Sequence, residues 1–159
     1  MENIENKEVQ HDKEAAQDND EIAMISATRD RLNKVIQDIK EWNATQFPEA
    51  DLPGQLIKLE EELHEFHNAH GEEERLKELP DVFIVCAGLG RWKSLIGYHI
   101  LSLIVNGAHH TEVNRLLDEV GFKMAKNRAR VWIKDGEGKY HHDVKFDEPA
   151  NANGENTPA

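Results

Sequence analysis

The chain has 159 residues and a formal net charge of −12; 38% of its residues are hydrophobic, 6% aromatic and 31% charged. This length suits one domain with a single core, and the negative charge argues against a protein that binds nucleic acid or anionic membranes through a basic surface. A lone cysteine, Cys86, excludes an intrachain disulfide and is most simply a small core residue.

Most of the negative charge lies at the two ends. Residues 1–22 carry eight acids and two lysines, and residues 147–159 carry three acids and no base. The composition predicts disordered tails at 1–21 and 147–159, around one all-α domain at 22–146. The N-terminus lacks an apolar signal core, and charged residues interrupt the apolar region 82–105. We therefore expect no membrane span and a cytoplasmic protein, in the host cytoplasm if it is phage-encoded.

Two amphipathic helices are predicted in the first half. Apolar residues recur at helical spacing over 32–42, which predicts a helix ending near Asn43. A loop with prolines follows. A second apolar stripe over 56–66 predicts another helix, closed by Gly71.

A third helix is predicted from about Glu72 and contains the run 82–89, which is apolar on nearly every side and therefore buried. Pro80 either kinks this helix or lies in the first turn of a new one. The apolar segment 95–105 is either an added helix at a subunit interface or an insertion that covers the core.

The last predicted helix runs from about Thr111 to Trp132 and opens with the same apolar spacing as the first. No segment shows sustained strand alternation. The sequence thus predicts an all-α fold, a bundle of four to five helices.

Five carboxylates form the most informative pattern. On a helix, Glu61, Glu62 and Glu65 share one face beside the apolar stripe, where like charges repel. Glu78 and Asp81 lie at the head of the buried segment, where a charge is costly unless it is paired or metal-bound. If the two helices pack antiparallel, hard oxygen ligands converge, as Mg²⁺ or Mn²⁺ prefers. A solvated acidic face is the alternative.

A polar face on the last helix adds to this pattern. Lys123, Asn127 and Arg130 lie at i, i+4 and i+7. Two cations and an amide beside a metal cluster suit a polyphosphate substrate, whereas an ordinary solvated face is the other interpretation.

Three motifs in order point to a known family. Residues 58–65 have the pattern Lys-Leu-x-Glu-Glu-x-x-Glu, residues 78–81 have Glu-x-x-Asp, and residues 123–132 with His141-His142 follow. Over about residues 28–145 the chain resembles phage-type members of the MazG-like, all-α nucleoside triphosphate pyrophosphohydrolases. The resemblance implies hydrolysis of a nucleoside triphosphate, with a deoxynucleotide preferred, to the monophosphate and pyrophosphate by water attack at the α-phosphorus. It also implies a homodimer or homotetramer.

The resemblance assigns roles to the predicted residues. It implies Mg²⁺ (or Mn²⁺) as cofactor, held by Glu62, Glu65, Glu78 and Asp81. Glu61 would be a further ligand or the base that aligns water, so the catalytic candidates are Glu61 and Glu62. Substrate contacts would come from Lys58, Lys123 and Arg130 on the phosphates and Asn127 on sugar or base. Trp42 is a candidate for stacking on the base, or a core residue at the edge of its stripe.

Histidines offer weaker candidates. His64, His67 and His70 are spaced by three, but they turn away from the acidic face and no thiol joins them, so we expect no zinc site there. The pair His109-His110 follows a turn and is expected at the surface. His141-His142 is a candidate to fold over the site.

Two other classes of protein stay open. Glu61-x-x-His64 resembles half of a di-iron carboxylate site, which uses this motif twice. The other copy, Glu8 with His11, lies in the predicted tail, so only symmetric pairing of two chains would complete such a site. A non-catalytic helical interaction module with solvated carboxylates is the third class.

Overall fold

The computed structural model describes residues 2–136 and 140–142, with side chains from residue 16 onward. Within these residues, five α-helices, a 3₁₀ turn and a two-stranded hairpin follow one another, which confirms the predicted all-α class. The elements are α1 Glu2–Gln46, α2 Leu52–Asn68, α3 Glu72–Leu89, η1 Gly90–Trp92, α4 Leu95–Asn106, α5 His110–Ala129, β1 Trp132–Lys134 and β2 Tyr140–His142.

The helix α3 lies at the centre of the bundle and contacts each of the other four helices. Its run 82–89 is buried throughout, which explains why this segment is apolar on every side. Pro80 is also buried and lies inside α3. The structure therefore has one continuous helix across this proline, and no new helix starts there.

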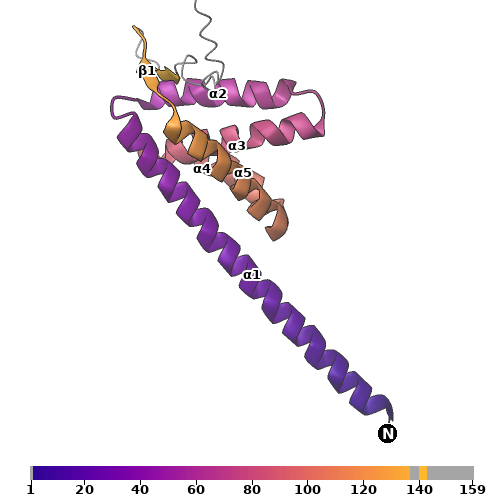
Figure 1. Cartoon of the computed structure of the whole chain (residues 1–159). Helices are drawn as coiled ribbons and strands as arrows, with labels where there is room; N and C mark the ends of the chain where they lie inside the picture. The colour runs from indigo at the N-terminus through magenta and orange to yellow at the C-terminus, as the bar shows by residue number, and fades with distance from the viewer. Residues whose placement is uncertain (1, 137–139, 143–159) are drawn as a thin grey trace, which may run out of the picture.

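A short turn reverses the chain between α2 and α3. The helix α2 begins where Asp51 Oδ1 accepts a hydrogen bond from the Gly54 N–H at 2.8 Å, an N-cap that satisfies one free donor of the first turn. After α2 ends at Asn68, Gly71 takes a φ of 99°, a conformation that favours glycine. As a result α2 and α3 lie side by side (Figure 1), as the short connection predicted.

The first helix is longer than predicted. We expected residues 1–21 to be disordered, whereas α1 begins at Glu2. No glycine or proline occurs in residues 2–46, so nothing in the local sequence stops the helix before Pro48. Figure 1 shows the N-terminal part of α1 extending away from the other helices. The predicted tail 147–159 lies outside the described residues, so the division into domains stays a prediction.

The last helix is shorter than predicted. It ends at Ala129, and Arg130 already has an extended backbone. Trp132, expected in the helix, instead begins β1, which pairs antiparallel with β2 so that Trp132 lies opposite His142. Strands of three residues are too short to show an alternating pattern, and for this reason the hairpin was not predicted.

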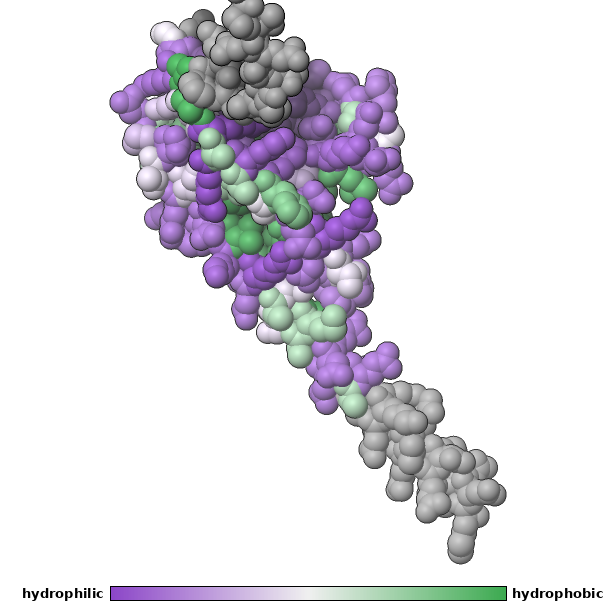
Figure 2. All heavy atoms as spheres, in the orientation of Figure 1, coloured by the Kyte–Doolittle hydropathy of each residue, from purple (hydrophilic) through white to green (hydrophobic). Residues whose placement is uncertain are grey.

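Hydrophobic side chains remain on parts of the surface. The helix α4 buries Gly97 and Leu101 but exposes Leu95, Tyr98 and Leu103. The face in Figure 2 is mostly hydrophilic, with hydrophobic side chains gathered over the middle of the bundle and on α1 where it leaves the bundle. In the described part of the chain, no helix combines the length and apolar character needed to cross a membrane.

Candidate functional site

Among the predicted carboxylates, Glu62 is the buried one. Its side chain is on α2, and the residue is only 7% exposed. Burial raises the pKa of the Glu62 carboxyl; Lys58 opposes this, and the nearby charges of Asp81 and Glu65 raise the pKa further. The charge of Asp81 on α3 therefore acts on Glu62 on α2, and the metal site itself stays a prediction.

Two lysines from different helices contact this cluster. Lys58 Nζ lies 2.9 Å from Glu62 Oε1 and 3.2 Å from Glu61 Oε2. Burial alone would lower the pKa of the Lys58 ammonium, but its contacts with Glu62 and Glu61 outweigh burial and raise it. From α5, Lys123 forms a hydrogen-bonded ion pair with Asp81. Both lysines predicted to bind phosphate thus pair with predicted metal ligands.

The residues Glu61, Glu65 and Glu78 are less buried than Glu62. Glu65 and Glu78 both line an open depression of about 440 Å³ between the end of α2 and the start of α3. Glu61 is exposed and is held by Lys58. Residues from both acidic motifs therefore border the same solvent-accessible space.

Carboxylate oxygens are the right donors for Mg²⁺. However, no three of the five carboxylates, all of them described, bring oxygen atoms within 4.8 Å of one another; in the described residues only Glu21, His109 and His110 form such a group. The ammonium groups of Lys58 and Lys123 contact Glu62 and Asp81 instead. The five residues fit Mg²⁺ by chemistry, and a bound ion would replace lysine contacts at two of them.

Asn127 and Arg130 lie together at the end of α5. Arg130 Nη1 donates to Asn127 Oδ1 at 3.0 Å, and Trp132 Nε1 donates to the Asn127 carbonyl at 2.9 Å. These bonds connect α5 to the hairpin. Lys123 lies one helical turn earlier, about 6 Å along the axis, so α5 joins the carboxylate cluster to the hairpin.

Trp42 belongs to an aromatic cluster that sequence reasoning did not foresee. Its ring centroid lies 5.3 Å from Phe47 and 6.3 Å from Trp132, and Phe47 lies 4.9 Å from Tyr140. Arg91 holds the loop after α1 by donating to the Phe47 carbonyl at 2.7 Å. The cluster depends on the hairpin, for which the sequence showed no signal.

The histidine candidates fall in different places. His64, His67 and His70 are exposed, and His64 contacts Asn68 on its own helix at 3.0 Å. Side chains of Glu8 and His11 lie outside the described part of the chain. His141 and His142 lie in β2, with the His142 ring 6.1 Å from Trp132; His142 therefore borders the aromatic cluster.

Comparison with known proteins adds no relative. No family model matches the chain, no curated protein matches it, and no solved structure matches its fold.

Proposed function

We propose that the chain is a Mg²⁺-dependent nucleoside triphosphate pyrophosphohydrolase, which converts a nucleoside triphosphate, preferably a deoxynucleotide, to the monophosphate and pyrophosphate. One observation carries the proposal: Glu62, Glu65 and Asp81 converge from two helices, and two lysines contact the cluster. The order of the three motifs, with their resemblance to the MazG-like family, supports the same activity.

In the proposed reaction a water oxygen bonds to the α-phosphorus. The bond from that phosphorus to the bridging oxygen breaks, and pyrophosphate leaves with the electron pair. A proton of the water passes to Glu61 or Glu62. Burial raises the pKa of the Glu62 carboxyl, which suits this residue to accept a proton.

The five carboxylates would hold the metal, which lowers the pKa of bound water and neutralises phosphate charge. Lys58 and Lys123 would then leave Glu62 and Asp81 and turn to the substrate, because the phosphates bring the negative charge that the metal has cancelled on the acids. The lysines are therefore proposed to exchange carboxylate partners for phosphate partners when substrate binds.

The arrangement of α5 suggests an orientation for the proposed substrate. Lys123 lies at the carboxylates, Asn127 lies one turn further on, and Trp132 belongs to the aromatic cluster with Trp42. A triphosphate at Lys123 would point its sugar toward Asn127 and Arg130. Its base would point toward Trp42, where an aromatic face can stack on any base.

A nucleotide panel tests the proposed activity. The purified chain is incubated with each common ribo- and deoxynucleoside triphosphate and Mg²⁺ or Mn²⁺, and both products are identified. We expect the monophosphate and pyrophosphate, with none formed in EDTA. Glu62→Gln and Asp81→Asn should each reduce turnover at least about a hundredfold. Glu60→Gln, an exposed neighbour on the same helix, should not.

Two results would contradict the proposal, the first its activity and the second its site. One is the absence of pyrophosphate from every nucleotide. The other is full turnover in both Glu62→Gln and Asp81→Asn, which would place any activity at a different site.

We further propose that the chain forms a homodimer or homotetramer through the outer face of α4. Leu95, Tyr98 and Leu103 are 70%, 66% and 78% exposed on this helix. A second copy of the same helix offers the same apolar residues, so a symmetric pair would cover both faces at once.

A further inference from the structure

A row of hydrogen-bonded polar side chains, called the polar seam below, holds α1 against α5. Asn114 Nδ2 donates to Thr28 Oγ1 at 2.7 Å, and Arg31 donates to Asn114 Oδ1 at 2.9 Å and to Asp118 Oδ1 at 2.5 Å. Thr28 is buried at this contact. The contacts join Thr28 to Asn114 and Arg31 to Asp118, so residue numbers rise together along the two helices. The helices α1 and α5 therefore run in the same direction here. Toward their N-termini, the seam leads to Glu21 on α1 and to His110, the first residue of α5.

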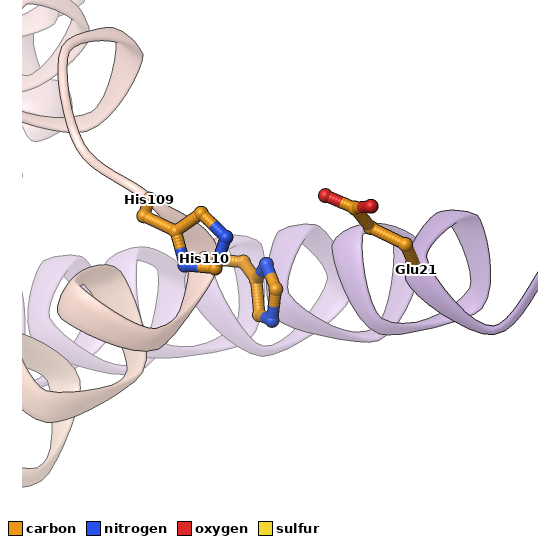
Figure 3. A group of neighbouring side chains, drawn as sticks. All are labelled: Glu21, His109 and His110. Atoms are coloured by element: carbon orange, nitrogen blue, oxygen red, sulfur yellow. The ribbon is translucent and has the colours of Figure 1, made fainter. Parts of the chain in front are cut away.

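Three metal-ligating side chains meet at this end of the seam. One ligand atom from each of Glu21, His109 and His110 lies within 4.8 Å of the other two. The two imidazole rings have centroids 4.0 Å apart. Figure 3 shows both rings beside α1, and the Glu21 carboxylate on the side of α1 that faces them. His110 is half-buried, and the other two are exposed.

These donors suit Zn²⁺ and chemically similar divalent ions such as Co²⁺, which are called zinc-class ions below. Two imidazoles and one carboxylate bind Zn²⁺ or Co²⁺ with a coordination position left for water, whereas Mg²⁺ prefers oxygen ligands alone. This cluster therefore differs in chemistry from the carboxylates around Glu62.

Local contacts prepare His109 for this role. His109 Nδ1 lies 2.9 Å from Thr111 Oγ1. With its proton on Nδ1, the ring donates a hydrogen bond to that hydroxyl and leaves Nε2 free to bind an ion. Metal-bound histidines usually donate their other ring N–H to a neighbouring acceptor in this way. This tautomer gives up the longer contact, 3.4 Å, in which the ring accepts the Thr111 N–H. The positive end of α5 disfavours a cation, and the Glu21 carboxylate offsets that.

We propose that Glu21, His109 and His110 bind one zinc-class divalent ion, which clamps α1 to the start of α5. The clamp lies where α1 leaves the bundle, beyond the contacts of Thr28 and Arg31. Its ion would hold the turns of α1 around Glu21 in place without entering the carboxylate site.

Metal binding to the full-length, untagged chain tests the site. The protein is stripped with EDTA and titrated with Zn²⁺ in a calorimeter, and with Co²⁺ while visible absorption is recorded. We expect tetrahedral Co²⁺ absorption and a Zn²⁺ site whose affinity falls at least about tenfold in Glu21→Gln and in His110→Gln. His109 is left intact because, without a metal, its side chain caps α5 and a substitution would also remove this cap. Matched controls are His67→Gln and Glu62→Gln, which should bind Zn²⁺ as the wild type does.

Amide hydrogen exchange tests the clamp separately. Zn²⁺ should slow exchange in residues 16–27 of α1 in the wild type but not in His110→Gln. Circular dichroism of each variant checks that the helices form. Zn²⁺ affinity unchanged in both Glu21→Gln and His110→Gln, or lost in His67→Gln, would overturn the site. Zn²⁺ binding without slower exchange would overturn the clamp. None of these readouts depends on nucleotide hydrolysis.

Discussion

The helix α4 lies so close to α3 at Gly97 that a single added methyl group gives a sharp prediction. A Cβ atom at Gly97 would lie 2.6 Å from the Cys86 carbonyl oxygen and 2.9 Å from Leu89 Cβ. The oxygen belongs to the backbone of α3, the central helix, and cannot rotate away. Gly97→Ala would therefore push α4 off α3.

The magnitude follows from two opposing effects. Overpacking of this kind costs about 1–3 kcal/mol, and alanine returns at most about 1 kcal/mol of helix propensity. We expect Gly97→Ala to lower the free energy of unfolding by about 1–2 kcal/mol. Gly121 is the matched control, because a Cβ there meets no atom within 4 Å. Gly121→Ala should raise the free energy of unfolding by about 0.5–1 kcal/mol.

Urea unfolding of both variants, followed by helical circular dichroism at one protein concentration, measures the difference. An unchanged dependence on urea would show that the unfolded states are comparable. If Gly97→Ala were as stable as Gly121→Ala, the close packing of α4 on α3 would be incorrect.

Three further predictions address the acid cluster, the core thiol and the surface. In EDTA, Glu62→Gln should be at least as stable as the wild type at pH 7. Its stability relative to the wild type should rise from pH 4 to 7, because the pKa of Glu62 is raised in the folded chain and ionisation of Glu62 therefore weakens the fold. A variant less stable than the wild type across this range would contradict the prediction. Burial raises the pKa of Cys86 to about 12. Iodoacetamide at pH 8 should therefore label this thiol only when urea unfolds the chain. Rapid labelling of the folded chain would show instead that α3 is accessible. By light scattering, Leu103→Glu should shift the assembly toward monomer while Glu60→Gln leaves it unchanged; equal masses would refute the α4 interface.

The helices and core were predictable because burial imposes helical spacing on apolar residues. The stripes at 32–42 and 56–66 lie in α1 and α2, and the all-apolar run lies in the central α3, where contacts on all sides require it. Helix ends were less predictable. The acidic composition of residues 1–21 predicted disorder, but composition does not register that no breaker occurs before Pro48.

The approach of the acidic motifs of α2 and α3 was predictable, because a short turn joins the two helices. The pairing of lysines with these acids was not predictable. A reversal at Gly71 brings the acidic motifs of α2 and α3 to similar heights along the two helices, and the charge of Asp81 acts on Glu62. The pairing of Lys123 with Asp81 depends on the rotation of α5 about its own axis, which residue spacing does not determine. Glu21 and His109 are separated by most of the chain, and no local pattern links them.

The charges of the cluster would link its lysine contacts to the proposed metal site. Three carboxylates around a buried side chain need positive charge to offset their repulsion, and without a metal this charge comes from Lys58 and Lys123. A divalent ion would supply the same charge at closer range, so under the proposed function the lysines would become available to phosphate once the metal is bound. Nucleotide affinity should therefore depend on Mg²⁺ even where the ion does not touch the nucleotide. Replacing Lys123 by methionine should weaken nucleotide binding and, in the absence of metal, leave Asp81 without its cation.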